Sequence, residues 1–296
     1  APGDDRRAGL GGGLMAWVIG VLAVLLLGVL IYWQLIIAEG AYLGRRVVTL
    51  LYDWSARMYD RIKQFQPRYE QWFLARPLAK ALFSFPNPWI LDVATGTARL
   101  GRALFREVSF RGRVAGLDLS RKMLEQAAAK TKKWSDRLPL LWQNASDLPF
   151  PDDTFEVVTC LEALEFMPDP ETVLSEMVRV LRPGGILMTT NRIGRDAKWM
   201  PGRTYDAEAC EDMLRNLGLE MIRIRPWQED YDLVWAVKPG SLIPLDPRPL
   251  EDLLRCPLCG AEVHREDAAF VCGSAHVIPI ADDGIIEIVN AHPIRS

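Results

Sequence analysis

A long apolar run near the start of the chain limits how that part can fold. Residues 14–37 contain Gln34 as their only strongly polar side chain. A helix of that length extends about 36 Å, enough to cross a hydrocarbon core of about 30 Å. Trp17 near one end and Tyr32 with Trp33 near the other are placed like interfacial aromatic anchors. The run exceeds the roughly 7–15 residues of a signal-peptide core, so we predict a transmembrane helix.

Basic residues are more frequent after this run than before it. An excess of Lys and Arg marks the cytoplasmic side of a span. We therefore expect a short tail over residues 1–13, a single membrane pass, and a cytoplasmic C-terminal part. The residues compared are Arg6 and Arg7 before the run, and Arg45, Arg46, Arg57, Arg61 and Lys63 after it.

The next segment, residues 38–67, has the pattern of an amphipathic helix. Steps of three and four separate its apolar residues, which predicts one helical stripe between residues 41 and 65. Such a helix can lie on the membrane surface with its arginines near anionic headgroups, or it can cover the ligand site of the following domain. The stripe consists of Leu43, Val47, Leu50, Leu51, Trp54, Met58, Ile62 and Phe65.

From residue 68 to residue 239 the chain has the pattern of an α/β domain. Short aliphatic runs alternate with helical segments, which predicts a mainly parallel sheet with helices on both faces. The last two strands have no helix between them, so we expect an antiparallel hairpin at the sheet edge. Expected strands are 89–93, 113–118, 140–143, 154–160, 185–190, 220–225 and 233–237; expected helices are 98–105, 120–131, 170–180 and 207–217. A proline-rich linker, residues 240–249, then leads to a separate small module, residues 250–296.

The first predicted strand runs directly into small residues, DVATGTA at positions 92–98. Small side chains let a ligand approach the backbone at the C-terminal end of a sheet, where open α/β folds bind ligands. A dinucleotide-binding loop would need glycine where Ala94, Gly96 and Arg99 stand, and Arg99 is too large for close packing of helix on strand. The loop therefore suits a ligand without a pyrophosphate.

Asp118 closes the second predicted strand. A carboxylate there can accept two hydrogen bonds from vicinal ribose hydroxyls. Taken alone, such an acid is more often a solvated loop carboxylate, but the 92–96 loop before it favours a ribose contact. Ser120 is placed to cap the next helix.

Four sequence blocks occur in register in this domain. They are LDVATGTA (91–98), GLDLSRKML (116–124), NASDLPFPDDTFEVV (144–158) and EMVRVLRPGG (176–185). Together they resemble the class I S-adenosylmethionine-dependent methyltransferases, in particular the type 11 branch that includes the ubiquinone and menaquinone biosynthesis enzymes. The resemblance covers residues 89–238. It implies a Rossmann-like class I methyltransferase sheet and S-adenosylmethionine, a cytosolic metabolite, as cofactor.

The resemblance also implies roles for the matching residues. Asp92, Ala94 and Gly96 would line the methionine end of the cofactor, and Asp118 would hold the ribose. Ala94 stands where the family usually has glycine. The residues that would contact the adenine are Leu119 and Met123 by packing, Asp147 through the amino group, and Leu148 through its backbone.

Methyl transfer needs mainly the alignment of two reactants about 3–3.5 Å apart, so a catalytic constellation need not be visible. Glu162 and Glu165, just after the fourth predicted strand, are candidates for a general base. They can equally cap or solvate a loop. The basic loop 191–203, which contains Trp199, can be a lid, an anion contact, a membrane-facing patch or simply a solvated loop.

The C-terminal module contains the pattern C-x2-C-x12-C-x3-H, formed by Cys256, Cys259, Cys272 and His276. Three thiolates and an imidazole match a closed tetrahedral zinc site, although a metal-free cluster is the alternative. His264 is not needed for this set. The module resembles zinc-ribbon-like modules of methyltransferase activators and of an rRNA guanine methyltransferase family, with His276 in place of their fourth cysteine. We expect structural zinc that contributes folding free energy.

These patterns predict a membrane-anchored S-adenosylmethionine-dependent methyltransferase whose substrate is a lipophilic small molecule, such as a quinone, a tetrapyrrole or an isoprenoid-like compound. One alternative is a catalytically silent subunit of a membrane protein complex that keeps the methyltransferase fold. Another is an RNA methyltransferase. The net charge of −3 offers no basic excess for a nucleic acid, which argues against that partner.

Overall fold

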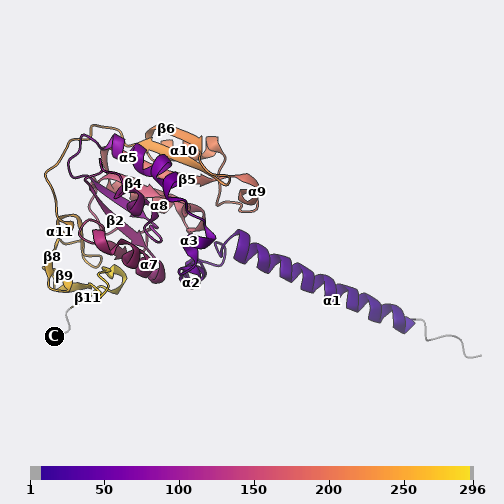
Figure 1. Cartoon of the computed structure of the whole chain (residues 1–296). Helices are drawn as coiled ribbons and strands as arrows, with labels where there is room; N and C mark the ends of the chain where they lie inside the picture. The colour runs from indigo at the N-terminus through magenta and orange to yellow at the C-terminus, as the bar shows by residue number, and fades with distance from the viewer. Residues whose placement is uncertain (1–7, 294–296) are drawn as a thin grey trace, which may run out of the picture.

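The computed structural model of the chain describes residues 8–293, and a seven-stranded sheet lies at the centre of the domain (Figure 1). The strand order is β3-β2-β1-β4-β5-β7-β6. Strands β1 to β5 pair in parallel, whereas β7 is antiparallel to both β5 and β6. The predicted edge hairpin is thus confirmed. The strands are β1 (Trp89–Val93), β2 (Arg113–Asp118), β3 (Leu140–Trp142), β4 (Phe155–Cys160), β5 (Leu181–Arg192), β6 (Glu220–Pro226) and β7 (Tyr231–Val237).

Helices cover both faces of this sheet, because β1 and β4 are buried at every residue and must be shielded on each side. One core packs α5, α6 and α7 against the sheet, and the other packs α8 and α10. Ser120, Asp169 and Asp206 cap the N-termini of α7, α8 and α10 by accepting a backbone hydrogen bond. The helical elements are α5 (Arg76–Ala81), α6 (Arg99–Leu104), α7 (Arg121–Thr131), η3 (Lys132–Trp134), η4 (Leu164–Phe166), α8 (Pro170–Val180), α9 (Gly194–Ala197) and α10 (Ala207–Asn216).

The apolar N-terminal segment is a helix that projects away from the domain (Figure 1). It consists of α1 (Ala8–Tyr32) and a π-helical turn, η1 (Trp33–Ile37). The stretch Met15–Ile37 is long and apolar enough to cross a membrane. The helix begins at Ala8, within the predicted tail over residues 1–13. Residues 1–7, with the two arginines counted there, lie outside the described part of the chain.

The single helix expected between residues 41 and 65 is wrong. The segment forms α2 (Arg45–Ser55) and α3 (Tyr59–Ile62), separated by a turn. Each piece is bonded to the domain separately, because Asp53 in α2 accepts from the Ser120 hydroxyl and Asp60 in α3 accepts from the Thr97 hydroxyl. A further helical stretch then leads to α5, built from α4 (Pro67–Glu70) and η2 (Gln71–Ala75).

The C-terminal residues form a second, four-stranded sheet in the order β11-β10-β9-β8. This module is not a separate unit as expected, because Leu254, Phe270 and Ile278 belong to the same core as β1 and α8. The module has too few apolar residues for a core of its own. It buries them against the sheet beside the connection between β3 and β4, whose described residues form no helix. Its elements are α11 (Leu250–Leu253), β8 (Val263–Glu266), β9 (Ala269–Cys272), β10 (His276–Pro279), η5 (Ile288–Asn290) and β11 (His292–Pro293).

Ile286 of this module also joins the central sheet. Its N–H donates to the Leu140 carbonyl at 2.9 Å, and its carbonyl accepts from the Trp142 N–H at 2.8 Å. The bridge between Leu141 and Ile286 is parallel. The module therefore continues the sheet beyond β3.

Candidate functional site

A cavity of about 830 Å³, part of it open to solvent, lies at the C-terminal ends of β1, β2 and β4. This position is where the strand order reverses, which is the usual ligand site of an open α/β sheet. The walls are formed by Arg45, Val48, Thr49 and Tyr52 of α2, by Tyr59, Ala94, Gly96, Met123 and Val173, and by residues 117–120, 143–146, 161–163 and 166–168.

Asp118 lies on the cavity wall at the end of β2. Its Oδ2 accepts from the Gly96 N–H and its Oδ1 accepts from the Ser120 N–H, both at 2.8 Å. These bonds fix the carboxylate and still leave a lone pair on each oxygen. Burial raises the pKa of Asp118 to about 6, although the two N–H groups lower it. The carboxylate is thus oriented to accept further hydrogen bonds from a ligand.

The 92–98 loop forms the adjoining wall. Asp92 is buried beneath it and accepts from the Thr95 and Thr159 hydroxyls at 2.6 and 2.7 Å. Burial also raises the pKa of Asp92. Ala94 lines the cavity with a φ of 53°, a left-handed conformation that costs a residue with a Cβ about 1–2 kcal/mol. This backbone requirement explains why glycine suits the position occupied by Ala94.

Only part of the predicted adenine contact set reaches the cavity. Leu119 and Met123 line it, but Asp147 is exposed and Leu148 is buried outside the lining. The Leu148 N–H is already engaged, because it donates to Glu176 Oε2 at 2.9 Å. In place of Asp147 and Leu148, the structure brings residues 143–146 to the wall.

The two glutamates proposed as bases have different surroundings. Glu162 lines the cavity and pairs with the buried Arg99, Nη1 to Oε1 2.8 Å. Glu165 is buried away from that cavity, beside a smaller hollow, and accepts a hydrogen bond from the Tyr231 hydroxyl. Burial raises the pKa of Glu165. The structure therefore brings one of the two candidates, Glu162, to the cavity.

The α2–α3 segment roofs the cavity, which is the second of the two alternatives left open for it. Tyr52 and Tyr59 face the cavity with their ring centroids 5.9 Å apart. Asp53 accepts from the Ser120 hydroxyl, and Asp60 accepts from the Thr97 hydroxyl at 2.6 Å. The sequence analysis did not identify these residues. The sequence signal they share is a spacing of seven residues between the two tyrosines and between the two acids.

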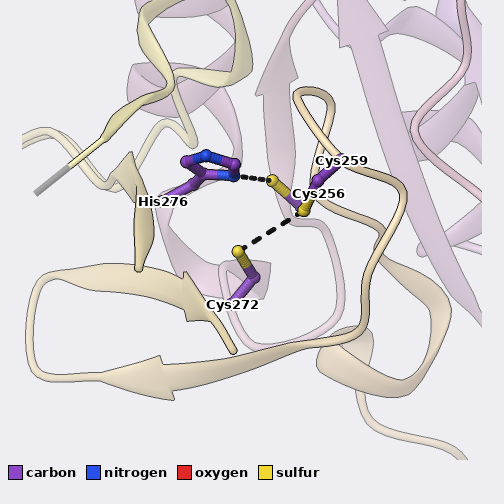
Figure 2. Close-up of side chains that lie close together, drawn as sticks. All are labelled: Cys256, Cys259, Cys272 and His276. Atoms are coloured by element: carbon purple, nitrogen blue, oxygen red, sulfur yellow. Dashed lines mark hydrogen bonds between the residues drawn. The ribbon is translucent and has the colours of Figure 1, made fainter. Parts of the chain in front are cut away.

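Cys256, Cys259, Cys272 and His276 converge in the C-terminal module (Figure 2). All of their ligand atoms lie within 4.8 Å of one another. Cys256 Sγ is 3.4 Å from His276 Nδ1, and Cys259 Sγ is 3.7 Å from Cys272 Sγ. His264 lies outside this group and contacts Glu266 instead.

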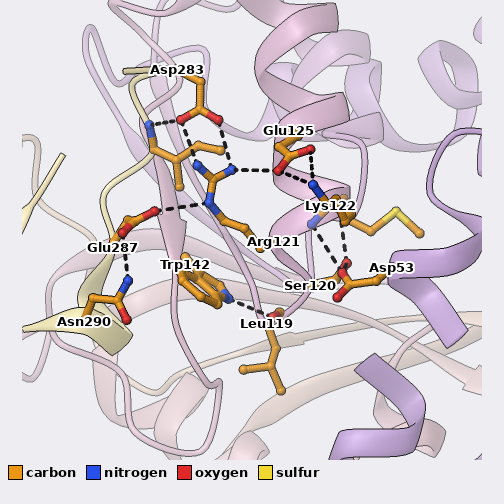
Figure 3. A network of polar contacts seen from close by, with 12 residues as sticks. Asp53, Leu119, Ser120, Arg121, Lys122, Glu125, Trp142, Asp283, Glu287 and Asn290 are labelled. Atoms are coloured by element: carbon orange, nitrogen blue, oxygen red, sulfur yellow. Dashed lines mark hydrogen bonds and ion pairs between the residues drawn. The ribbon is translucent and has the colours of Figure 1, made fainter. Parts of the chain in front are cut away.

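The first turn of α7 connects the roof and the C-terminal module to the cavity wall (Figure 3). On one side, Ser120 bonds to Asp53 of α2. On the other, Arg121 pairs with Asp283 at 2.9 Å and with Glu287 at 3.3 Å. Because Asp118 immediately precedes this turn, both appended segments help to fix its position.

Comparisons with known proteins agree with this geometry. Residues 91–189 match a family model described as a methyltransferase domain. A demethylmenaquinone methyltransferase from Bacillus licheniformis is 45% identical over 95 residues, which cover 32% of this chain and 40% of that relative. Another from Symbiobacterium thermophilum is 37% identical over 139 residues, covering 46% of this chain and 55% of the relative. The chain spans about half the length of these curated relatives.

The fold has a counterpart among solved structures. The CurJ carbon methyltransferase superimposes with a TM-score of 0.51 at 14% sequence identity, covering 57% of this chain and 54% of that one. At this identity the likeness concerns the fold alone. Together with the family match, it shows that the central domain is a Rossmann-like class I methyltransferase domain.

Proposed function

We propose that this chain, whose central domain has the class I methyltransferase fold, is a membrane-anchored S-adenosylmethionine-dependent methyltransferase acting on a lipophilic, quinone-like acceptor. One observation carries the proposal. Asp118 is held by two N–H groups at the wall of the cavity, next to a loop of small residues. A carboxylate so placed suits a ribose diol, and the loop admits the sulfonium end of the cofactor.

The residues of the cavity fit the cofactor in three groups. Asp92, Ala94 and Gly96 hold the methionine end, with Asp92 acting from beneath the loop. Asp118 holds the ribose. For the adenine, Leu119 and Met123 supply packing, and residues 143–146 lie where the base would extend. Asp147 and Leu148 keep a role only after a local rearrangement that frees the Leu148 N–H from Glu176.

The cofactor supplies an activated methyl group, so the chain contributes mainly orientation and exclusion of water. Tyr52 and Tyr59 close the cavity from above, and Phe166 lies on its wall. Glu162 is the stronger of the two candidates for proton removal from an acceptor, because it is the one on the cavity wall. Glu165 is the weaker candidate, because neither it nor Tyr231, whose hydroxyl it accepts from, lines the cavity.

The acceptor is proposed from two observations. The similar curated proteins are demethylmenaquinone methyltransferases by name. The cavity wall also includes the apolar side chains of Val48, Phe166, Met167 and Val173, which suit a quinone ring or its isoprenoid tail. A membrane anchor keeps the enzyme where such molecules are concentrated, and a cytosolic cofactor requires the domain on the cytoplasmic side.

The C-terminal cluster is proposed as a structural zinc site. In a tetrahedron with Zn–S bonds of about 2.3 Å and Zn–N bonds of about 2.05 Å, the S···S and S···N edges are about 3.8 and 3.6 Å. The separations of 3.7 Å between Cys259 and Cys272 and 3.4 Å between Cys256 and His276 fit these edges. All four positions are protein ligands, so the metal would stabilise the fold rather than act on substrate.

Calorimetry of the full chain in detergent with S-adenosylmethionine and its demethylated product tests cofactor binding. We expect binding by the wild type and a loss of at least tenfold in affinity for Asp118→Ala, about 1.4 kcal/mol. Asp212→Ala, which removes an exposed carboxylate of α10, is the matched control and should bind normally. A wild type that binds neither compound would favour the silent-subunit alternative.

A second assay tests the acceptor. Membranes containing the chain are incubated with methyl-labelled cofactor, and lipid, protein and RNA fractions are counted separately. We expect label in the lipid extract, and less of it with Asp118→Ala. Label confined to RNA would support the RNA methyltransferase alternative, and label confined to protein would also overturn the lipophilic acceptor.

A further inference from the structure

The end of the N-terminal helix is fixed to the catalytic domain rather than joined by a free linker. The Trp33 indole N–H donates to the Trp199 carbonyl, and the Tyr42 hydroxyl donates to the Pro201 carbonyl, both at 2.8 Å. Arg203 donates to the Ala41 carbonyl at 3.2 Å. Ala41 itself is only 1% exposed. The part of the domain around residues 33–42 therefore has a defined orientation relative to α1.

Around this junction the domain carries exposed apolar side chains. Leu43, Leu50 and Trp54 are 52%, 66% and 80% exposed, and Trp199 is 60% exposed. Basic side chains lie among them. We name this set the root surface; it consists of Leu43, Leu50, Trp54 and Trp199 with the exposed cations Arg46, Arg57 and Lys198.

Helix α2 has two distinct faces. Its inner face, with Arg45, Val48, Thr49 and Tyr52, lines the cavity. Its outer face, at steps of four residues, carries Arg46, Leu50 and Trp54 toward solvent. A soluble domain gains nothing from a large exposed tryptophan and leucine on one stripe, whereas a membrane interface favours both, and anionic headgroups favour the arginine.

We infer that the root surface lies in the headgroup region of an anionic bilayer, so that α2 separates the bilayer from the cavity. This inference rests on the proposed membrane span. In Figure 1, α2 and α3 lie beside the domain end of α1, where a bilayer crossed by α1 would begin. A helix is about 10–12 Å across with its side chains, so the cavity lies one helix thickness from the lipid. A lipophilic acceptor can then move between bilayer and cavity past the edge of α2.

The inference is tested on the full chain in lipid nanodiscs that contain phosphatidylcholine and phosphatidylglycerol. A nitroxide is attached through p-acetylphenylalanine at position 50 or 54, which leaves the native cysteines untouched. The control position is Val108, which is 96% exposed in the loop between α6 and β2, at the end of the sheet away from the cavity. Collision with lipid-soluble oxygen and with a water-soluble nickel chelate is measured at each position.

We expect the ratio of oxygen to nickel accessibility to be several-fold higher at positions 50 and 54 than at position 108. Arg46→Glu combined with Arg57→Glu should lower that ratio at position 54, and phosphatidylcholine alone should do the same. Equal ratios at positions 54 and 108 would overturn the inference. Cofactor calorimetry on the same discs separates the two proposals. Normal cofactor binding with labels exposed to water would reject only the position of the root surface in the bilayer. Labels exposed to lipid without cofactor binding would reject only the proposed methyltransferase function.

Discussion

Arg99 and Glu162 form an ion pair inside the domain, with Nη1 and Oε1 2.8 Å apart and both side chains less than a tenth exposed. The Arg99 guanidinium also packs over Phe65 and Trp227. Burial raises the pKa of Glu162, but Arg99 and Lys63 outweigh it, and the net pKa lies below the usual value. The Glu162 carboxylate therefore stays ionised at neutral pH, and its pair with Arg99 joins α6 to the segment after β4.

Glu162→Gln should therefore lower the free energy of unfolding by about 1.5–3 kcal/mol at neutral pH, because the buried Arg99 loses one of its two carboxylate partners and keeps only Glu70, with Nε and Oε2 3.2 Å apart. A group with a lowered folded pKa stabilises above its unfolded pKa, about 4.3, and the contribution disappears as the pH falls through the folded value. Chemical denaturation in detergent at several pH values measures this. Glu211→Gln, at an exposed pair on α10, is the control and should change stability by less than about 1 kcal/mol. A Glu162→Gln variant of full stability that has lost turnover would identify a base instead.

Cofactor affinity should depend on pH through Asp118. Its pKa is about 6, raised by burial, so the carboxylate is ionised above that pH and can accept from two ribose hydroxyls. As the pH falls through 6, protonation converts one oxygen into a donor, and the affinity should fall by up to about tenfold per pH unit. Calorimetry between about pH 5 and 7.5 measures this change. Asp118→Asn should bind weakly at every pH, and a wild-type affinity that does not vary would contradict the ribose contact.

Removal of the metal should loosen the C-terminal module. We expect about one zinc per purified chain and none in His276→Ala, because the four-ligand set would be incomplete. His264→Ala removes a histidine outside the cluster and should retain the metal. Elemental analysis gives the stoichiometry, and hydrogen exchange of β8–β10 reports the loosening. A His276→Ala chain with full zinc content would exclude this ligand set.

Arg121 should matter more than its neighbour Lys122, although both are basic residues in the first turn of α7. Arg121 pairs with Asp283 and Glu287 of the C-terminal module, whereas the Lys122 ammonium pairs with Glu125 of its own helix. Because the Arg121 pairs are partly exposed, Arg121→Ala should cost about 1 kcal/mol and Lys122→Ala almost nothing. Denaturation measures both, and faster exchange of the Ile286 N–H should accompany the first. Equal effects of the two variants would show that the pairs do not hold the module.

The sequence predicted the central sheet well because its signal is local. Strands β1 and β2 and helix α8 have the predicted bounds, since buried aliphatic runs and a capping Asp169 mark them directly. Strand β5 starts earlier than expected, at Leu181, because Pro183 and Gly184 have the composition of a turn. In the structure they form an irregularity within the strand, with Gly184 at a φ of 76°, between the pairs Leu181–Phe155 and Ile186–Val157. That outcome depends on pairing with β4, which local sequence does not encode.

The roof and the C-terminal module were predicted less well, for the same reason. The predicted apolar stripe did not mark the cavity face of α2, because its members Leu50 and Trp54 are exposed. The contact of Asp53 with Ser120, which holds α2 to the domain, joins positions far apart in the chain. The pairing of Ile286 with β3 and the engagement of the Leu148 N–H by Glu176 are likewise long-range. By contrast, Asp118 and Gly96 were identified because each lies at the end of a recognisable strand, and the structure brings them into contact.

The position of Ile286 beside β3 affects the tendency of the protein to self-associate. A bare edge strand offers unpaired N–H and C=O groups on which a foreign strand can assemble. Here Ile286 of the same chain already pairs with part of the β3 edge, through the Leu140 carbonyl and the Trp142 N–H. A chain truncated before Ile286 would therefore expose the edge of β3. We expect such a chain to self-associate by edge-to-edge strand pairing and to aggregate.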